Sequence, residues 1–127
     1  MQTNQTFGTA LNCIDGRAQQ AVTNWLKEQY HVDFVDMITE PGMDNVLNTA
    51  PHVIIEHIKD NAQISITAHK SCIIAIAGHH DCAGNPTSRE EHWQHIHQAV
   101  DLIKSWQWSI KVIGLWLNDQ WHIEEVR

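Results

Sequence analysis

Apolar residues follow two alternating patterns along the chain, short runs and helical repeats. Residues 7–14 form a short apolar run, which predicts a buried strand. From Ala18 the apolar residues recur at positions 18, 21, 22, 25 and 26, the spacing of one helix face, so we expect a helix that ends near Tyr30. Residues 32–38 alternate polar and apolar side chains, which predicts a second strand that ends in a turn at residues 39–42.

The middle of the chain allows two interpretations. Pro51 suits the first turn of a helix that extends through residue 58. Asp60 or Asn61 can cap another helix, which reaches His69. The alternation of apolar and hydroxyl side chains over residues 64–67 is equally compatible with a strand.

A buried strand and a well-marked helix are predicted next. Residues 72–77 are all apolar except for the thiol at their start, and Gly78 closes the run, which is typical of a strand covered on both faces. Ser88 and Glu91 have the spacing of a capping box, S-x-x-E. Apolar residues with helical spacing follow this box, at Trp93, Ile96, Val100 and Ile103.

The C-terminal region predicts a hairpin, with strands at residues 111–117 and 121–126 and a turn at residues 118–119. Strands that alternate with helices indicate an α/β fold. We therefore expect a mainly parallel sheet of about five strands with helices on both faces and an antiparallel C-terminal edge strand. No internal repeat or linker-like tract interrupts the sequence, so we expect a single domain over residues 1–127.

Composition and charge narrow the classes of partner. Fifteen acidic residues against eight basic ones give a net charge of −7, and no run of Lys or Arg occurs, which argues against nucleic acid. Residues 1–12 lack the charged and apolar regions of a signal peptide, and no apolar run is long enough to span a bilayer. We expect a cytoplasmic protein with no membrane partner. The six tryptophans are expected in the core and at a subunit interface.

Two groups of chemically active residues lie at the ends of predicted strands. Cys13, Asp15 and Arg17 follow the first strand, and in an extended segment these alternate positions share one face. His79 and Cys82 follow the third strand, three residues apart, so one turn can direct both toward one metal ion. Two thiolates and an imidazole are sufficient to hold zinc with one coordination position open.

The third cysteine, Cys72, lies at the start of a predicted buried strand. We expect it to be a core thiol, because free cysteine is among the most buried residue types. Cys13 and Cys82 are better explained as metal ligands than as a disulfide in a reducing compartment. A redox role for this pair has little support, since the chain has no C-x-x-C motif.

The segments C-x-D-x-R at residues 13–17 and G-H-x-x-C at residues 78–82 resemble the motifs of the β-class carbonic anhydrases. The likeness in the order of strands and helices extends from about Leu11 to the C-terminus. The resemblance implies that family's α/β fold, a helix at residues 60–69, and a homodimer or larger homo-oligomer.

This chain also departs from the family pattern. The family usually carries N-terminal helices that wrap a neighbouring subunit, whereas twelve residues precede Cys13 here. After the second strand the family commonly has Asn-Ala-Gly, whereas this chain has Glu40-Pro41-Gly42. We therefore expect a dimer whose subunits wrap around each other less, and a pocket beside the metal that differs in shape from that of the family.

The resemblance implies zinc-dependent, reversible hydration of carbon dioxide to bicarbonate and a proton. Cys13, His79 and Cys82 would bind Zn²⁺, and the fourth position would hold water. Asp15 would accept a hydrogen bond from that water, and Arg17 would keep Asp15 ionised and in place.

A histidine is the side chain best suited to carry the released proton to buffer. Four histidines near the second motif are candidates for this shuttle, and the simpler interpretation is that they are ordinary surface residues: His80, His92, His95 and His97.

Two other functions are compatible with the same ligands. Relatives with this ligand set hydrolyse carbonyl sulfide or carbon disulfide. The chain could also be a non-catalytic zinc-binding domain, but a structural zinc site is closed by four protein ligands, so Asp15, His80 or Asp81 would have to supply the fourth. The Asp15 and Arg17 pair argues against that interpretation, because a structural site has no need of it.

Overall fold

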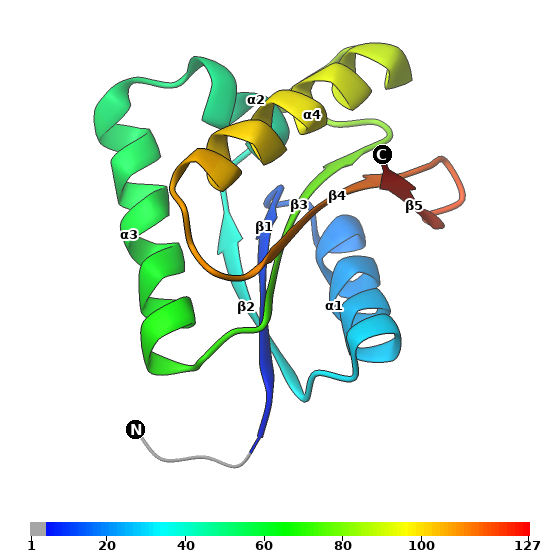
Figure 1. Ribbon diagram of the computed structural model, residues 1–127. Coiled ribbons are helices and arrows are strands. Elements are labelled where there is room, and N and C mark those ends of the chain that lie inside the picture. The colour runs from blue at the N-terminus through cyan, green and yellow to red at the C-terminus, as the bar shows by residue number, and fades with distance from the viewer. Residues whose placement is uncertain (1–4) are drawn as a thin grey trace.

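A sheet of five strands, in the order β2-β1-β3-β4-β5, runs through the computed structural model, which describes residues 5–127 (Figure 1). The strands are β1 (Phe7–Asn12), β2 (Phe34–Thr39), β3 (Ile73–His79), β4 (Lys111–Leu117) and β5 (Ile123–Val126). The helices are α1 (Gly16–Tyr30), α2 (Met43–Thr49), α3 (His52–Ala68) and α4 (Arg89–Ser105).

The strand directions confirm the predicted sheet. Strands β2, β1, β3 and β4 are parallel to their neighbours, and β5 pairs antiparallel with β4 at one edge. The register places Gly78 opposite Trp116 and His79 opposite Leu117. The α/β fold with an antiparallel C-terminal edge strand is thus as expected, whereas the single domain over residues 1–127 stays a prediction.

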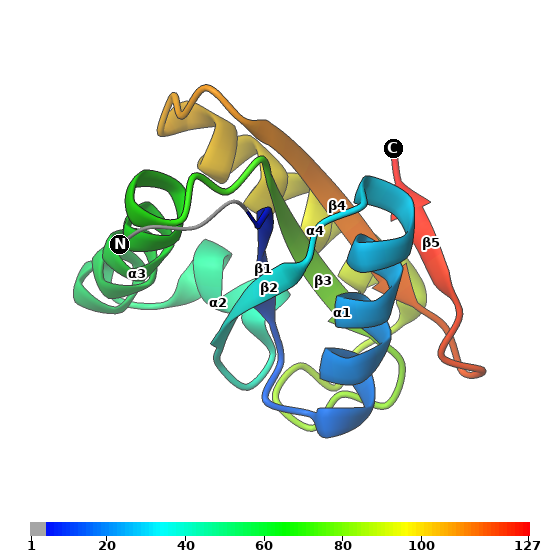
Figure 2. The same ribbon diagram turned by 90° about the horizontal axis from the view of Figure 1, so that it is seen from below.

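Helices cover both faces of the sheet, one on one face and three on the other (Figures 1 and 2). Helix α1 packs one face with Val22 and Leu26, against side chains such as Ala75 of β3. Helices α2, α3 and α4 share the opposite core with Ile74 and Ile76. Strand β3 is buried along its whole length because neighbouring side chains point into different cores.

Helix α3 is a single helix where the sequence suggested two. It extends from His52 to Ala68, and Asp60 and Asn61 lie inside it rather than at a cap. No glycine or proline interrupts this segment, so the backbone ladder continues past both residues. The strand alternative for residues 64–67 is wrong.

Helix α2 is an element that the sequence patterns did not predict. It has only seven residues and begins after Gly42, whose φ of 65° lies in the left-handed region. Gly42 has no side chain to accept from the first N–H groups, so the start of α2 lacks the Ser, Thr, Asp or Asn that marks many helix starts.

Cys72 is exposed, so the prediction of a core thiol is wrong. Strand β3 begins one residue later, at Ile73, and Ser71 is the residue that turns inward at this point. The Ser71 hydroxyl is 2.7 Å from the Thr9 hydroxyl, and the Cys72 N–H donates to the Phe7 carbonyl. The hydroxyl pair inside the protein leaves the Cys72 side chain outside.

The tryptophans pack against the body of the molecule. Trp116 is buried, and the other five are partly buried. The exposed large apolar side chains are instead one aromatic and several aliphatic residues: Ile14, Phe34, Val53, Ile54 and Ile64. The tryptophan count therefore gives no separate support for a subunit interface.

Within residues 5–127, no helix is both long enough and apolar enough to cross a membrane.

Candidate metal centre

The two sequence motifs meet where β1 and β3 end side by side. Cys13 directly follows β1, and His79 is the last residue of β3. Strand β2 lies on one side of β1, and β3 lies on its other side. The strand order therefore reverses direction between β1 and β3. Ligand sites of open α/β sheets form at such a point, beyond the carboxyl ends of the strands.

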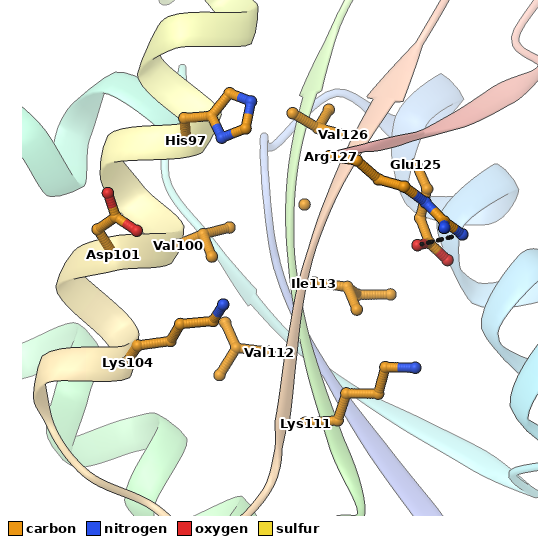
Figure 3. A pocket seen from close by; sticks show the side chains of 11 residues that line it. His97, Val100, Asp101, Lys104, Lys111, Val112, Ile113, Glu125, Val126 and Arg127 are labelled. Atoms are coloured by element: carbon orange, nitrogen blue, oxygen red, sulfur yellow. Dashed lines mark ion pairs between the residues drawn. The ribbon is translucent and has the colours of Figure 1, made fainter.

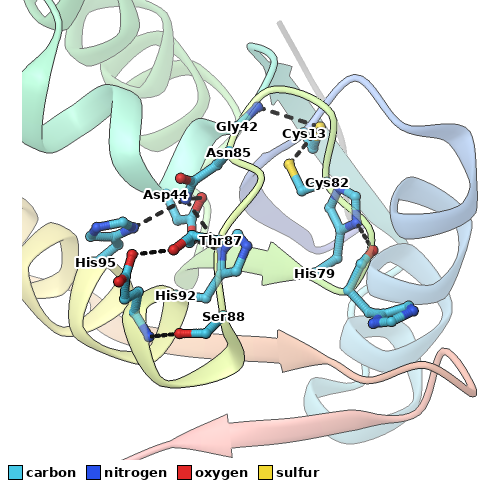
Figure 4. A network of polar contacts seen from close by, with 12 residues as sticks. Cys13, Gly42, Asp44, His79, Cys82, Asn85, Thr87, Ser88, His92 and His95 are labelled. Carbon is cyan, nitrogen blue, oxygen red and sulfur yellow. Dashed lines mark hydrogen bonds and ion pairs between the residues drawn. The ribbon is translucent and has the colours of Figure 1, made fainter.

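Cys13, His79 and Cys82 form a compact, buried group (Figure 4). The two Sγ atoms are 4.0 Å apart, and one ligand atom from each residue lies within 4.8 Å of the others. All three side chains are almost completely inaccessible, with exposed fractions of 4%, 1% and 4% in chain order. Among residues 5–127, no fourth Asp, Glu, His or Cys joins this group.

The His79 ring has one satisfied and one unsatisfied nitrogen. Nδ1 is 2.7 Å from the His80 carbonyl oxygen, to which it can only donate, so Nε2 carries the lone pair. Nε2 is buried and has no hydrogen-bond partner among the described residues. A lone pair that is buried beside two thiols fits a zinc ion, because zinc binds imidazole nitrogen and thiolate sulfur. The hydrogen bond to His80 fixes the tautomer that this binding needs.

Local backbone geometry brings the ligands together. Asp81, between His79 and Cys82, has a φ of 55°, so the chain turns sharply there. On the other side, the Gly42 N–H points to the Cys13 sulfur at 3.5 Å. A Cβ on Gly42 would lie 2.6 Å from the Gly84 carbonyl oxygen, so only glycine allows these loops to approach so closely. The turn at residues 39–42 is thus a wall of the site.

Asp15 and Arg17 are joined, although not through an extended segment. Strand β1 ends at Asn12 and α1 begins at Gly16, so the expectation that residues 13, 15 and 17 share a strand face is wrong. Asp15 is instead the N-cap of α1, where its Oδ1 accepts from the Arg17 N–H at 2.9 Å. The Arg17 guanidinium also donates to both carboxylate oxygens, with Nη2 2.7 Å from Oδ2.

Arg17 also connects the two halves of the site. Its guanidinium lies 3.5 Å from the Asp81 carbonyl oxygen and 3.5 Å from the Asp81 carboxylate. It stacks on the Trp121 ring, 4.6 Å from the ring centroid, and Trp121 in turn lies beside His79. The sequence patterns missed this role of Trp121, because a lone tryptophan in a hairpin turn has no distinguishing signal.

The electrostatics differ between the carboxylate and the thiol. Hydrogen bonds from Arg17 lower the pKa of Asp15 from 3.8 to about 2, so this carboxylate is ionised at neutral pH. Burial and the neighbouring Cys13 raise the pKa of Cys82 to about 11. A divalent cation between the sulfurs would reverse that preference, because metal binding favours the thiolate.

The histidines considered as proton shuttles differ in exposure. His80 and His97 are exposed, as expected of surface residues. His92 is buried, so its interpretation as a surface histidine is wrong, and His95 is half-buried. His92 packs against Trp116 and pairs with Asp44, a residue that the sequence patterns did not single out.

A separate groove of about 400 Å³ lies between α4 and the β4–β5 edge (Figure 3). Its lining includes His97, Lys104, Lys111 and Glu125. None of the three residues of the metal centre lines it, so the groove is separate from that centre.

Comparisons with known proteins identify the family and the fold. A family model described as "Putative carbonic anhydrase" matches residues 3–127. A tetrameric β-carbonic anhydrase from Sordaria macrospora superposes with a TM-score of 0.63 at 12% identity, covering 97% of this chain and 82% of that one. No curated protein matches the sequence.

Two further solved structures share the fold. A carbonic anhydrase from Glaciozyma antarctica has a TM-score of 0.59 at 11% identity, over 94% of this chain and 81% of that one. A β-carbonic anhydrase from Trichomonas vaginalis has a TM-score of 0.51 at 14% identity, over 99% and 86%. At these identities the structures establish the fold alone.

Proposed function

Because the chain belongs to a carbonic anhydrase family of the β type, we propose that it catalyses the reversible hydration of carbon dioxide to bicarbonate and a proton, with zinc as cofactor. The observation that carries this proposal is the buried Nε2 of His79, which has no hydrogen-bond partner within residues 5–127 and lies beside the sulfurs of Cys13 and Cys82.

Cys13, His79 and Cys82 would hold the zinc ion. When bound, zinc supplies a Lewis acid that lowers the pKa of a water ligand from about 15.7 to about 7. The His80 carbonyl keeps the His79 ring oriented, and the Gly42 N–H donates to the Cys13 sulfur and holds it in place.

Asp15 and Arg17 would position the attacking water. Asp15 is ionised and therefore can only accept hydrogen bonds, so a water that donates to it presents its lone pair elsewhere, toward carbon dioxide. Arg17 holds the carboxylate from two directions, through the guanidinium and through its backbone N–H. Asp15 is the catalytic residue in this proposal, and Arg17 is its positioning residue.

His80 is exposed and adjacent to His79, so it is the histidine best placed to pass a proton to buffer. The shuttle role stays a prediction, as does the cytoplasmic location.

A homo-oligomer is also part of the proposal. The related protein from Sordaria macrospora is tetrameric. In this chain Val53 and Ile64 of α3 are 71% and 61% exposed, so this helix carries apolar surface that a second copy would cover in an oligomer. A solution mass of two or more times 14.6 kDa would support the homo-oligomer, and a mass of 14.6 kDa, that of one chain, would contradict it.

The test of Asp15 is an Asp15→Asn variant assayed by stopped-flow carbon dioxide hydration at known zinc content. We expect full zinc and a rate at least about 100-fold lower, the order of a lost proton-handling group. The matched control is Asp81→Asn, because Asp81 also contacts Arg17 but is 71% exposed and stands outside the metal-binding group. Its rate should stay near that of the wild type.

Three results would redirect the proposal. Full activity of Asp15→Asn would contradict the role of Asp15. Full zinc without hydration of carbon dioxide, but with turnover of carbonyl sulfide or carbon disulfide, would indicate the alternative hydrolase. Full zinc with no turnover of any of them would indicate a non-catalytic zinc domain.

A further inference from the structure

Beside the Cys13 group lies a second cluster of metal-ligating side chains, formed by Asp44, Asn85, His92 and His95 (Figure 4). Asp44 comes from α2, both histidines come from α4, and Asn85 comes from the loop between Cys82 and α4. One ligand atom each from Asp44, His92 and His95 lies within 4.8 Å of the others. The proposed carbon dioxide chemistry makes no use of this cluster.

The cluster is buried as a binding site would be. Asp44 and His92 are each 1% exposed, Asn85 is 6% exposed and His95 is half-buried. A buried carboxylate is costly unless it is paired or binds a cation. Strand β3 makes room for it, since a Cβ on Gly78 would lie 2.6 Å from Asp44 Oδ2.

Distances around the Asn85 amide match those between ligands of one ion. The amide atom placed as Nδ2 is 3.1 Å from Asp44 Oδ1, 3.3 Å from His92 Nδ1 and 3.1 Å from His95 Nδ1. Zinc–ligand bonds of about 2.0–2.1 Å in a tetrahedron separate neighbouring ligand atoms by about 3.4 Å. The amide atom therefore lies at nearly that spacing from one atom of each of the other three residues, whose own ligand atoms lie within 4.8 Å of one another.

The hydrogens on the side-chain nitrogens do not account for the contact between Asn85 and His92 as a hydrogen bond. His92 Nδ1 is 2.6 Å from Asp44 Oδ2, so it donates to the carboxylate and cannot also accept from Asn85. The 3.3 Å contact between Asn85 and His92 therefore joins two donors. The oxygen and nitrogen of an asparagine amide are nearly indistinguishable in shape, so a turned amide would present Oδ1 to the same centre.

We propose that Asp44, His92, His95 and the Asn85 amide oxygen bind a second divalent transition-metal ion, of the type of Zn²⁺ or Co²⁺. Two imidazoles with a carboxylate and an amide oxygen form a mixed nitrogen and oxygen ligand set, which suits such borderline ions. The Asp44–His92 hydrogen bond is replaced by two bonds to the ion, and the His92 proton leaves to solvent.

The ion would fasten the loop that carries Cys82 to α2 and α4. Asn48 already joins these helices, because its side chain donates to the carbonyl oxygens of Asp44 and His95. Asn85 lies three residues after Cys82, so a bond from Asn85 to a metal restrains that loop from its far end.

Metal stoichiometry tests the proposal. The full-length protein is dialysed against Zn²⁺ with a weak competing chelator, which removes ions from isolated surface histidines. We expect two zinc ions per wild-type chain and one per His95→Ala chain. The control is His97→Ala, because His97 is exposed on the same helix and outside the cluster, and it should keep both ions. One ion in the wild type, or equal counts in His95→Ala and the wild type, would overturn the proposal.

Cobalt distinguishes this site from the Cys13 centre, since only thiolate ligands give a sulfur-to-cobalt charge-transfer band. In the Cys13→Ser/Cys82→Ser variant we expect one Co²⁺ per chain, without that band. His95→Gln should keep the band and lose the band-free ion, with an unchanged far-ultraviolet circular dichroism spectrum as the folding control. If the cluster is a hydrogen-bond network only, the Cys13→Ser/Cys82→Ser variant will bind no Co²⁺, and this result would overturn the proposal. A missing charge-transfer band in both the wild type and His95→Gln would mean that the Cys13 centre binds no metal. That result would count against the carbonic anhydrase function instead.

Discussion

Arg17 has a central position among the individual residues of the metal centre. It holds the Asp15 carboxylate, contacts Asp81 in the turn between His79 and Cys82, and stacks on Trp121. The guanidinium is half exposed, so its contribution to stability is expected to be modest. Its main effect is on the charge and orientation of Asp15.

The pairing of Asp15 with Arg17 predicts a specific pH dependence of stability. The pKa of Asp15 is lowered from 3.8 to about 2, so ionised Asp15 stabilises the fold fully above pH 3.8 and loses this contribution as the pH falls toward 2. Replacing Arg17 by Gln removes the main cause of the lowered pKa. We expect the stability advantage of the wild type over Arg17→Gln to be constant above pH 4 and to shrink below it. Urea unfolding of the metal-free proteins across this range measures the advantage, and a pH-independent difference would refute the pairing.

A second prediction at the residue scale concerns Gly78. In Gly78→Ala the new Cβ would meet Asp44 Oδ2 at 2.6 Å and Ile96 Cδ1 at 3.0 Å, so the variant should lose about 1–3 kcal/mol of unfolding free energy. Gly16→Ala is the matched control, because a Cβ there meets nothing within 4 Å, and it should be neutral or slightly stabilising. Denaturant midpoints compare the two. Equal midpoints would mean that the space beside Gly78 is not tightly filled.

At the scale of elements, helix α1 was predictable from its apolar spacing, whereas the prediction of α4 and the failure to predict α2 depended on their end signals. The start of α4 was predictable from the S-x-x-E spacing of Ser88 and Glu91. In the structure the Ser88 hydroxyl accepts from the Glu91 N–H, as that spacing indicates. Helix α2 was missed because it is one short segment without a side-chain cap. Among the site residues, the two cysteine-bearing motifs were predictable from local spacing alone. The role of Asp44 was not predictable, because its partners lie 41 and 48 residues away in the sequence. Only the packing of α2 on α4 brings them together.

The cap of α4 gives a prediction at this scale. Ser88→Ala removes the hydroxyl that accepts from the Glu91 N–H at 3.1 Å, so the protein should lose about 1 kcal/mol of unfolding free energy. Ser105→Ala, at the exposed C-terminal end of the same helix, should change it by less than about 0.5 kcal/mol. Urea unfolding of both variants tests the difference, and equal losses would show that the cap contributes nothing of its own.

At the scale of the whole molecule, the sheet order decides where chemistry can occur. The strand order reverses between β1 and β3, and a crevice forms at the carboxyl ends of strands at such a point. Cys13 and the His79–Cys82 turn meet there. Helix α1 brings the Asp15–Arg17 pair to that place from one face, and α2 and α4 bring the Asp44 cluster from the other. The sequence allowed the first assembly to be anticipated, since its ligands lie at strand ends. It did not allow the second, which depends on how helices pack.

Zinc-dependent catalysis is tested most directly by the stopped-flow rate of carbon dioxide hydration before zinc removal, after chelation, and after zinc is returned. We predict a fast rate that disappears with the metal and returns when about one equivalent of thiolate-bound zinc is restored. A rate no faster than buffer in the fully zinc-loaded protein, or a fast rate that persists after zinc is removed, would contradict it.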